Sequence, residues 1–150
     1  MVIELYVSNL YSQIRAVSHR EVAEIPDVEA RYRAEAGTEK QDDINHCILD
    51  AAAKLESRCA RWLQESIINY ADNSHSVPES FYYEFSLSER RAVNKDSLAN
   101  AMNNFLLEYA LSKFYSIVSQ VELSNKHSLL ALSEGKALDE MLYTKHPPIV

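Results

Sequence analysis

The run DSLANAMNNFLLEYALSKFYSIVSQV, residues 96–121, decides the fold of this 150-residue chain. Its apolar residues recur at spacings of three and four, which is the repeat of one face of an α-helix. They are Leu98, Met102, Phe105, Tyr109, Ala110, Phe114, Ile117, Val118 and Val121. Asp96 is of a residue type that often caps a helix N-terminus, and no glycine or proline lies between Pro78 and Gly135. We therefore expect a long helix here, in a chain built mainly from helices.

The first 37 residues predict one long helix followed by a short one. The long helix ends near Pro26. Its apolar stripe consists of Ile3, Val7, Leu10, Ile14 and Val17. Residues 2–7 also alternate enough to form a short strand, but we favour the helix because the stripe continues beyond them. Asp27 can cap a second helical piece that reaches Ala36, and Gly37 is expected to end it in the left-handed conformation.

Two more helices are predicted, one in the middle of the chain and one near its end. Thr38 and Gln41 have the spacing of a capping box, and the stripe after them predicts a helix of about 30 residues that reaches Tyr70. The last helix carries Leu129, Leu130, Leu132, Leu138, Met141 and Leu142. Gly135 costs it about 1 kcal/mol relative to alanine and is a candidate position for a kink or a break. Whether the helices over 96–123 and 126–144 are continuous with each other stays open.

The segment FYYEFSL, residues 81–87, has the alternation of an extended chain. A single strand needs partners for its backbone groups, so it pairs with residues 2–7, pairs with another subunit, or lies as a strap across the helices. We favour the strap or the subunit pairing over a true sheet. Phe81, Tyr82 and Tyr83 are accordingly predicted as residues that bind a partner.

These elements predict an all-α fold, a bundle of four to five long helices in a single domain spanning residues 1–150. Residues 145–150 are expected to form a flexible tail, since Pro147 stops a helix. The net charge of −7 disfavours binding to nucleic acid or to an anionic membrane. No run approaches the roughly 20 apolar residues of a membrane span, and the N-terminal residues lack the basic flank of a signal peptide.

The two cysteines are expected to be reduced thiols. Cys47 and Cys59 fall in one predicted helix twelve residues apart, a rise of about 18 Å, so they cannot bridge each other. Free thiols are typical of a cytoplasmic protein, which is the location we expect.

One face of the third predicted helix could present metal ligands. Asp42, His46 and Asp50 are spaced by four residues, and metal sites do use such pairs. The apolar stripe lies elsewhere on this helix, so we favour a solvated face and expect neither metal nor cofactor.

A second arrangement of acids resembles the carboxylate signature of all-helical nucleotide pyrophosphohydrolases of the MazG type. Glu21 and Glu24 are followed by Glu39 and Asp42, each pair at a spacing of three. In that family, four acids on paired helices hold Mg²⁺ against a substrate diphosphate. The resemblance would assign that role to these four residues.

The order of elements over residues 81–121 resembles small helical phage and prophage structural proteins of the head-to-tail connector, or neck, type. The shared features are the extended aromatic segment 81–87 and a helix in which Glu108-Tyr-Ala stands between an apolar pair and the aromatic pair Phe114-Tyr115. The resemblance implies a non-enzymatic structural subunit, virion-associated if phage-derived, that forms a homo-oligomer or docks on a protein partner. A helical adaptor or regulatory binding module is the alternative.

Overall fold

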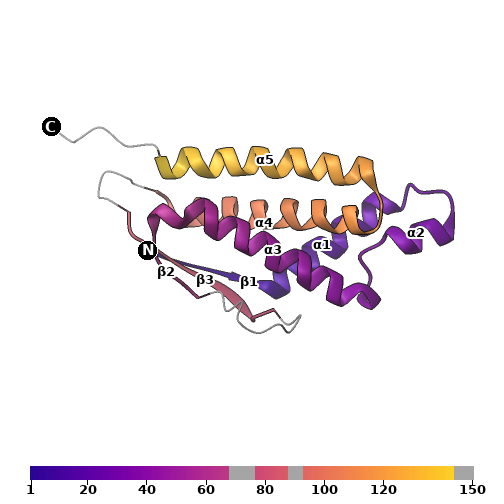
Figure 1. Cartoon of the computed structure of the whole chain (residues 1–150), viewed down its shortest axis with the longest axis horizontal. Coiled ribbons are helices and arrows are strands. Elements are labelled where there is room, and N and C mark those ends of the chain that lie inside the picture. Colours follow the sequence, from indigo (N-terminus) through magenta and orange to yellow (C-terminus); the bar gives the residue numbers. More distant parts are fainter. Residues whose placement is uncertain (68–76, 88–92, 144–150) are drawn as a thin grey trace.

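The computed structural model describes residues 1–67, 77–87 and 93–143 as a small sheet covered by helices (Figure 1). The elements are β1 (Val2–Tyr6), α1 (Val7–Val22), α2 (Val28–Ala34), a 3₁₀ turn (Thr38–Lys40), α3 (Gln41–Cys59), a 3₁₀ turn (Ala60–Trp62), β2 (Leu63–Ile67), β3 (Ser80–Phe85), α4 (Lys95–Ile117) and α5 (Val121–Tyr143). In Figure 1 the sheet lies along the lower side, α1, α3 and α4 lie above it, and α5 forms the upper layer. The predicted predominance of helix is confirmed, but the fold is α+β and the all-α prediction is wrong.

The sheet has three antiparallel strands in the order β1-β3-β2. In β3, Phe81, Tyr83 and Phe85 are buried while the residues between them are half-buried, as expected for a strand with one face on a core. Ile3 pairs with Tyr83 and is itself buried. The strap and the subunit pairing favoured for 81–87 are therefore wrong, because β1 and β2 supply the partners that the backbone of β3 requires.

The helix predicted from Ile3 begins only at Val7. Ile3 and Val7 suit a helical repeat, but Ile3, Leu5 and Val7 also alternate, and pairing with β3 selects the strand. α1 then buries Leu10 and Ile14 as predicted. The strand alternative for residues 2–7 was the correct one.

α2 has the predicted cap and a different end. The Asp27 carboxylate accepts a hydrogen bond from the Glu29 N–H at 3.1 Å. Gly37 has φ −79°, so it does not adopt the predicted left-handed conformation. The chain instead leaves α2 in an extended conformation, and the Ala36 N–H donates to the buried Ser18 hydroxyl at 2.8 Å.

α3 ends at Cys59, well before the predicted end at Tyr70. Residues 63–67 leave the helix because they pair with β3, and residues 68–70 lie outside the described residues. The predicted capping box does not form: Thr38 begins a 3₁₀ turn, and the Gln41 carboxamide bonds Arg15 and Asn45.

α4 and α5 form a hairpin joined by a short turn in which Ser119 has φ 61°. The cap of α4 is Asn94, whose side chain accepts from the Ser97 N–H at 3.0 Å, and Asp96 lies in the first turn. α5 runs through Gly135 without a break, and a turn separates it from α4. The predicted tail 145–150 lies outside the described residues.

Gly135 permits a close contact between α3 and α5. A Cβ there would lie 2.5 Å from Cζ of Arg58. Arg58 donates from Nε to the Gly135 carbonyl at 3.1 Å and from Nη2 to Asp139 at 2.9 Å. The glycine therefore lets an α3 side chain lie against the backbone of α5.

None of the described helices combines the length and apolar composition that crossing a bilayer requires.

Candidate functional site

The predicted partner residues of β3 divide between the two faces of the sheet. Phe81 and Tyr83 have 0% exposed surface and belong to the core, so neither can contact a partner in this structure. Tyr82 is half-buried on the opposite face, and its role in binding stays a prediction. β3 also has no open edge, since β1 and β2 pair with it on both sides.

The candidate metal ligands Asp42, His46 and Asp50 all lie on the exposed side of α3. The described part of the chain contains no group of three His, Cys, Asp or Glu side chains arranged to hold a metal ion. That statement includes the MazG-like acids, of which Glu24, Glu39 and Asp42 are exposed. The structure brings neither set together.

Both thiols are unsuited to nucleophilic chemistry. Cys47 and Cys59 are free and buried, consistent with the expected absence of a bridge between them. Burial raises the pKa of each thiol to about 12, with nearby carboxylates adding to the effect. The reactive thiolate is therefore scarce at neutral pH.

The most elaborate polar arrangement was not predicted from the sequence. Glu21 of α1, Glu108 and Tyr115 of α4, and Lys126 and His127 of α5 form what we call the His127 network. His127 is 3% exposed and bridges two carboxylates: Nδ1 lies 2.5 Å from Glu108 Oε2 and Nε2 lies 2.7 Å from Glu21 Oε1. Glu21 also accepts from the Tyr115 hydroxyl at 3.1 Å and from Lys126 Nζ at 2.8 Å.

This geometry favours the charged imidazolium of His127, because both ring nitrogens face carboxylate oxygens and each must donate. Burial alone would lower the pKa of His127, but the hydrogen bonds and negative charges of Glu108 and Glu21 outweigh it and hold that pKa above its usual value. Burial would raise the pKa of Glu21, yet Lys126 and His127 outweigh it and lower that pKa. Burial, together with the nearby Glu21 charge, raises the pKa of Tyr115.

All members of the His127 network except Tyr115 line a surface cavity of about 450 Å³ between α1, α4 and α5. Its members satisfy one another, so the arrangement ties three helices together and can hold or release a proton. One sequence signal could have revealed it. His127 stands on the buried stripe of α5, in line with Ala131, Gly135, Leu138 and Leu142, where an unpartnered polar side chain would be costly.

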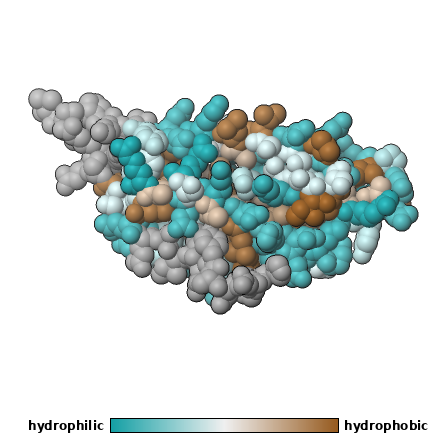
Figure 2. All heavy atoms as spheres, viewed as in Figure 1, coloured by the Kyte–Doolittle hydropathy of each residue, from teal (hydrophilic) through white to brown (hydrophobic). Residues whose placement is uncertain are grey.

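The outer face of α5 exposes some of the six apolar residues that the sequence analysis named for the last helix. Leu129 is 68% exposed and Leu132 50% exposed, whereas of those six residues only Leu138 and Leu142 are fully buried. Figure 2 shows apolar groups along the upper edge of the molecule, over α5, standing among hydrophilic ones. Glu122 and Lys136 are exposed on the same helix, and neither forms an ion pair with any residue that the structure describes.

Comparison of this chain with protein-family models, with curated proteins and with solved structures gave no match.

Proposed function

We propose that this chain is a non-enzymatic assembly subunit that forms a homo-oligomer through the outer face of α5. The observation that carries the proposal is the exposure of Leu129 and Leu132 in the outer layer of the molecule. Removing such side chains from water stabilises an interface by about 25 cal/mol per Å² of apolar area. A second copy of the chain is the occupant that the charges on this face favour.

The charge pattern on α5 is self-complementary. Glu122, Leu129 and Lys136 are seven residues apart, so they lie nearly in line along the helix at intervals of about 10.5 Å. If two α5 helices pack antiparallel about a two-fold axis at Leu129, the leucines of the two copies meet. Glu122 then lies opposite Lys136 of the second copy, and the reverse pair forms as well. A two-fold interface of this kind uses one patch twice.

The resemblance of residues 81–121 to connector proteins of phage origin supports an assembly role only in part. Its extended aromatic arm is a central strand here, so the proposal transfers the contact role from that segment to α5. Location in a virion or in the cytoplasm is part of the same proposal. A helical adaptor is the second candidate, favoured by the open edge of β1 described below.

A charge swap tests the proposed pairing. Glu122→Lys and Lys136→Glu should each lower the oligomer mass measured by light scattering over a range of concentrations, because each places like charges opposite one another. Combining them should restore the parent mass. Leu129→Glu should leave only the monomer, since a charge would be buried at the centre of the interface.

Val28→Glu is the matched control, because Val28 is 73% exposed on α2 and should tolerate the charge without a change in mass. Circular dichroism on the same samples verifies that helix content is unchanged. A parent protein that stays monomeric, or a double variant that behaves like the single ones, would contradict the proposal.

A further inference from the structure

β1 is an edge strand with a free side. Met1 and Phe85 exchange backbone hydrogen bonds, and the Val7 N–H donates to Glu79 O at 3.1 Å, so the odd-numbered residues bond to β3. In an antiparallel ladder the intervening residues point their backbone groups the other way. Over the part of the chain that is described, the N–H groups of Val2, Glu4 and Tyr6 and the carbonyls of Val2 and Glu4 have no hydrogen-bond partner.

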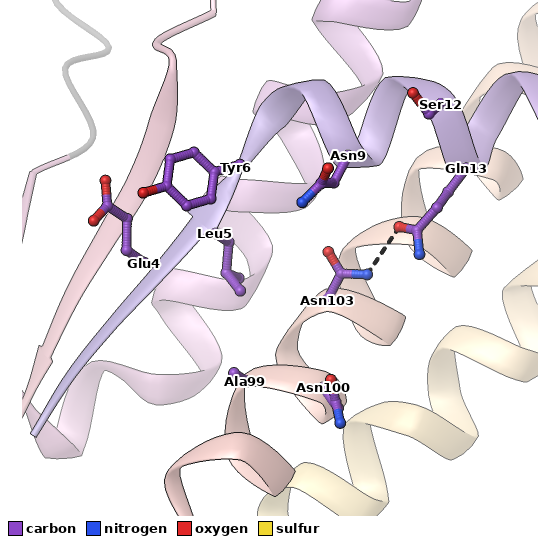
Figure 3. Close-up of a pocket in the computed structure, with 9 residues that line it drawn as sticks. All are labelled: Glu4, Leu5, Tyr6, Asn9, Ser12, Gln13, Ala99, Asn100 and Asn103. Atoms are coloured by element: carbon purple, nitrogen blue, oxygen red, sulfur yellow. Dashed lines mark hydrogen bonds between the residues drawn. The ribbon is translucent and has the colours of Figure 1, made fainter.

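A groove of about 430 Å³ lies beside this free edge. Figure 3 shows Leu5 pointing from β1 toward α4, while Glu4 and Tyr6 point away from it. The remaining walls come from α1 and α4 and consist mainly of small polar side chains: Asn9, Ser12, Gln13, Ala99, Asn100 and Asn103. Asn103 Nδ2 donates to Gln13 Oε1 at 2.9 Å, which joins the two helices across the groove.

We propose that this groove binds an extended segment of another protein, which pairs with β1 as a fourth strand. Two features identify a polypeptide as the occupant. The free edge offers donors and acceptors at the spacing of a strand, which a peptide backbone matches. The carboxamides of the walls each offer a donor and an acceptor, so they suit uncharged backbone and polar groups better than an ion.

The charge of the groove favours a different protein over a second copy of this chain as the occupant. Glu4 is the one charged residue among the nine that line it. Pairing β1 along its full length with β1 of a second copy would set Glu4 opposite Glu4, and like charges directly opposite destabilise a pair of strands. A partner segment with a lysine or arginine at that position is favoured instead.

The test is selection from a displayed library of randomised ten-residue peptides, followed by fluorescence anisotropy with the selected peptides. Glu4→Pro removes the outward N–H at the centre of the edge and leaves the ladder to β3 intact, since proline is tolerated on edge strands. It should weaken binding about tenfold or more, the loss expected for one hydrogen bond together with its neighbours. Glu4→Ala keeps the N–H and should weaken binding less.

Two further readouts keep the outcome decisive if Glu4→Pro perturbs folding, which its thermal melt would reveal. Asn100→Arg should obstruct the groove from α4 and abolish binding without touching the sheet. Hydrogen exchange at the Glu4 and Tyr6 amides of the parent should slow when peptide is added. Leu129→Glu, which tests the α5 interface, should bind peptide normally, so the two proposals fail separately.

Three results would overturn the inference. The library could yield no peptide that prefers the parent over Glu4→Pro. The selected peptides could bind equally well to a folded Asn100→Arg variant. Glu4→Pro could instead lower the oligomer mass of the parent, which would assign the edge to contacts between copies of this chain.

Discussion

α4 and α5 have the same length and lie side by side, but they differ in how much of each is covered. α4 buries nine of its 23 residues, and it contacts α1, α3 and β1 as well as α5. α5 buries five of 23, and its other face is open among the described residues. The comparison shows that an apolar stripe identifies a helix, while the neighbours of the helix decide which apolar residues are core.

The largest effect should come from truncating the core of α4. Phe114 is 1% exposed, and Phe114→Ala should lower the free energy of unfolding by about 3–5 kcal/mol through lost burial and the cavity left behind. Leu132→Ala, on the outer face of α5, should change it by less than about 0.5 kcal/mol when both variants are measured in the monomeric Leu129→Glu background. Urea unfolding of both variants in that background measures the contrast, and equal losses would show that the outer face of α5 is covered within the monomer.

The His127 network should produce the next largest effect, because it joins α5 to α4 and α1. His127→Gln removes a buried cation between Glu21 and Glu108 and should cost about 2 kcal/mol. The exposed His19, which pairs with Glu35 at the surface, is the matched control, and His19→Gln should be nearly neutral.

The pH dependence of this loss follows from the pKa shifts. The raised pKa of His127 gives stability that is complete below its unfolded value of about 6.5 and is lost as pH rises through the folded value. The lowered pKa of Glu21 gives stability that is present above about 4.3 and is lost as pH falls through its folded value. The parent should therefore exceed His127→Gln in stability most clearly between about pH 4.5 and 6.5. A difference that grows above pH 8 would contradict the charged histidine.

A smaller effect is expected at the start of α4. Asn94→Ala removes the side chain that accepts from the Ser97 N–H and should cost about 1 kcal/mol. Asn94→Asp keeps a capping oxygen and should cost much less. If the two variants melt at the same temperature, the cap does not contribute to stability.

The smallest net effect should come from Gly135→Ala in α5. Alanine favours a helix by about 1 kcal/mol over glycine, but the new Cβ would displace the Arg58 guanidinium from its place against α5. The two terms should nearly cancel in the parent. In an Arg58→Ala background the same substitution should stabilise by about 1 kcal/mol, and an equal effect in both backgrounds would refute the role assigned to this contact.

The helices could be predicted because their signals are local. Leu98, Phe105 and Phe114 mark the face of α4 within one continuous run, and Asp27 caps α2 from an adjacent position. The strands could not be predicted securely, because residues 2–6 satisfy both a helical and a strand repeat and their partners lie in residues 80–84. The end of α3 was missed for the same reason, since residues 60–67 contain no glycine or proline and their partner strand β3 is distant in the sequence.

The candidate sites were harder to predict than the fold. Phe81 and Tyr83 were assigned to a partner surface because an extended aromatic segment with no predicted partner strand has to pack against another surface. In the structure both side chains pack in this chain's own core. The His127 network joins side chains from three helices, with Glu21 and His127 separated by 106 positions. No spacing rule connects such residues, although a histidine within an apolar stripe indicates that a buried partner exists.

The pairing of β1 with β3 also has a consequence for how the chain reaches its folded state. α4 and α5 are consecutive and can associate as soon as both are formed, whereas β1 must close a loop of about half the chain before it gains a partner. On the ribosome β1 emerges before the strand that pairs with it, because α1, α2 and α3 are made between the two. The order of synthesis therefore opposes the order of assembly, and β1, which is made before its partner strand, is expected to be among the last of these elements to reach its folded position.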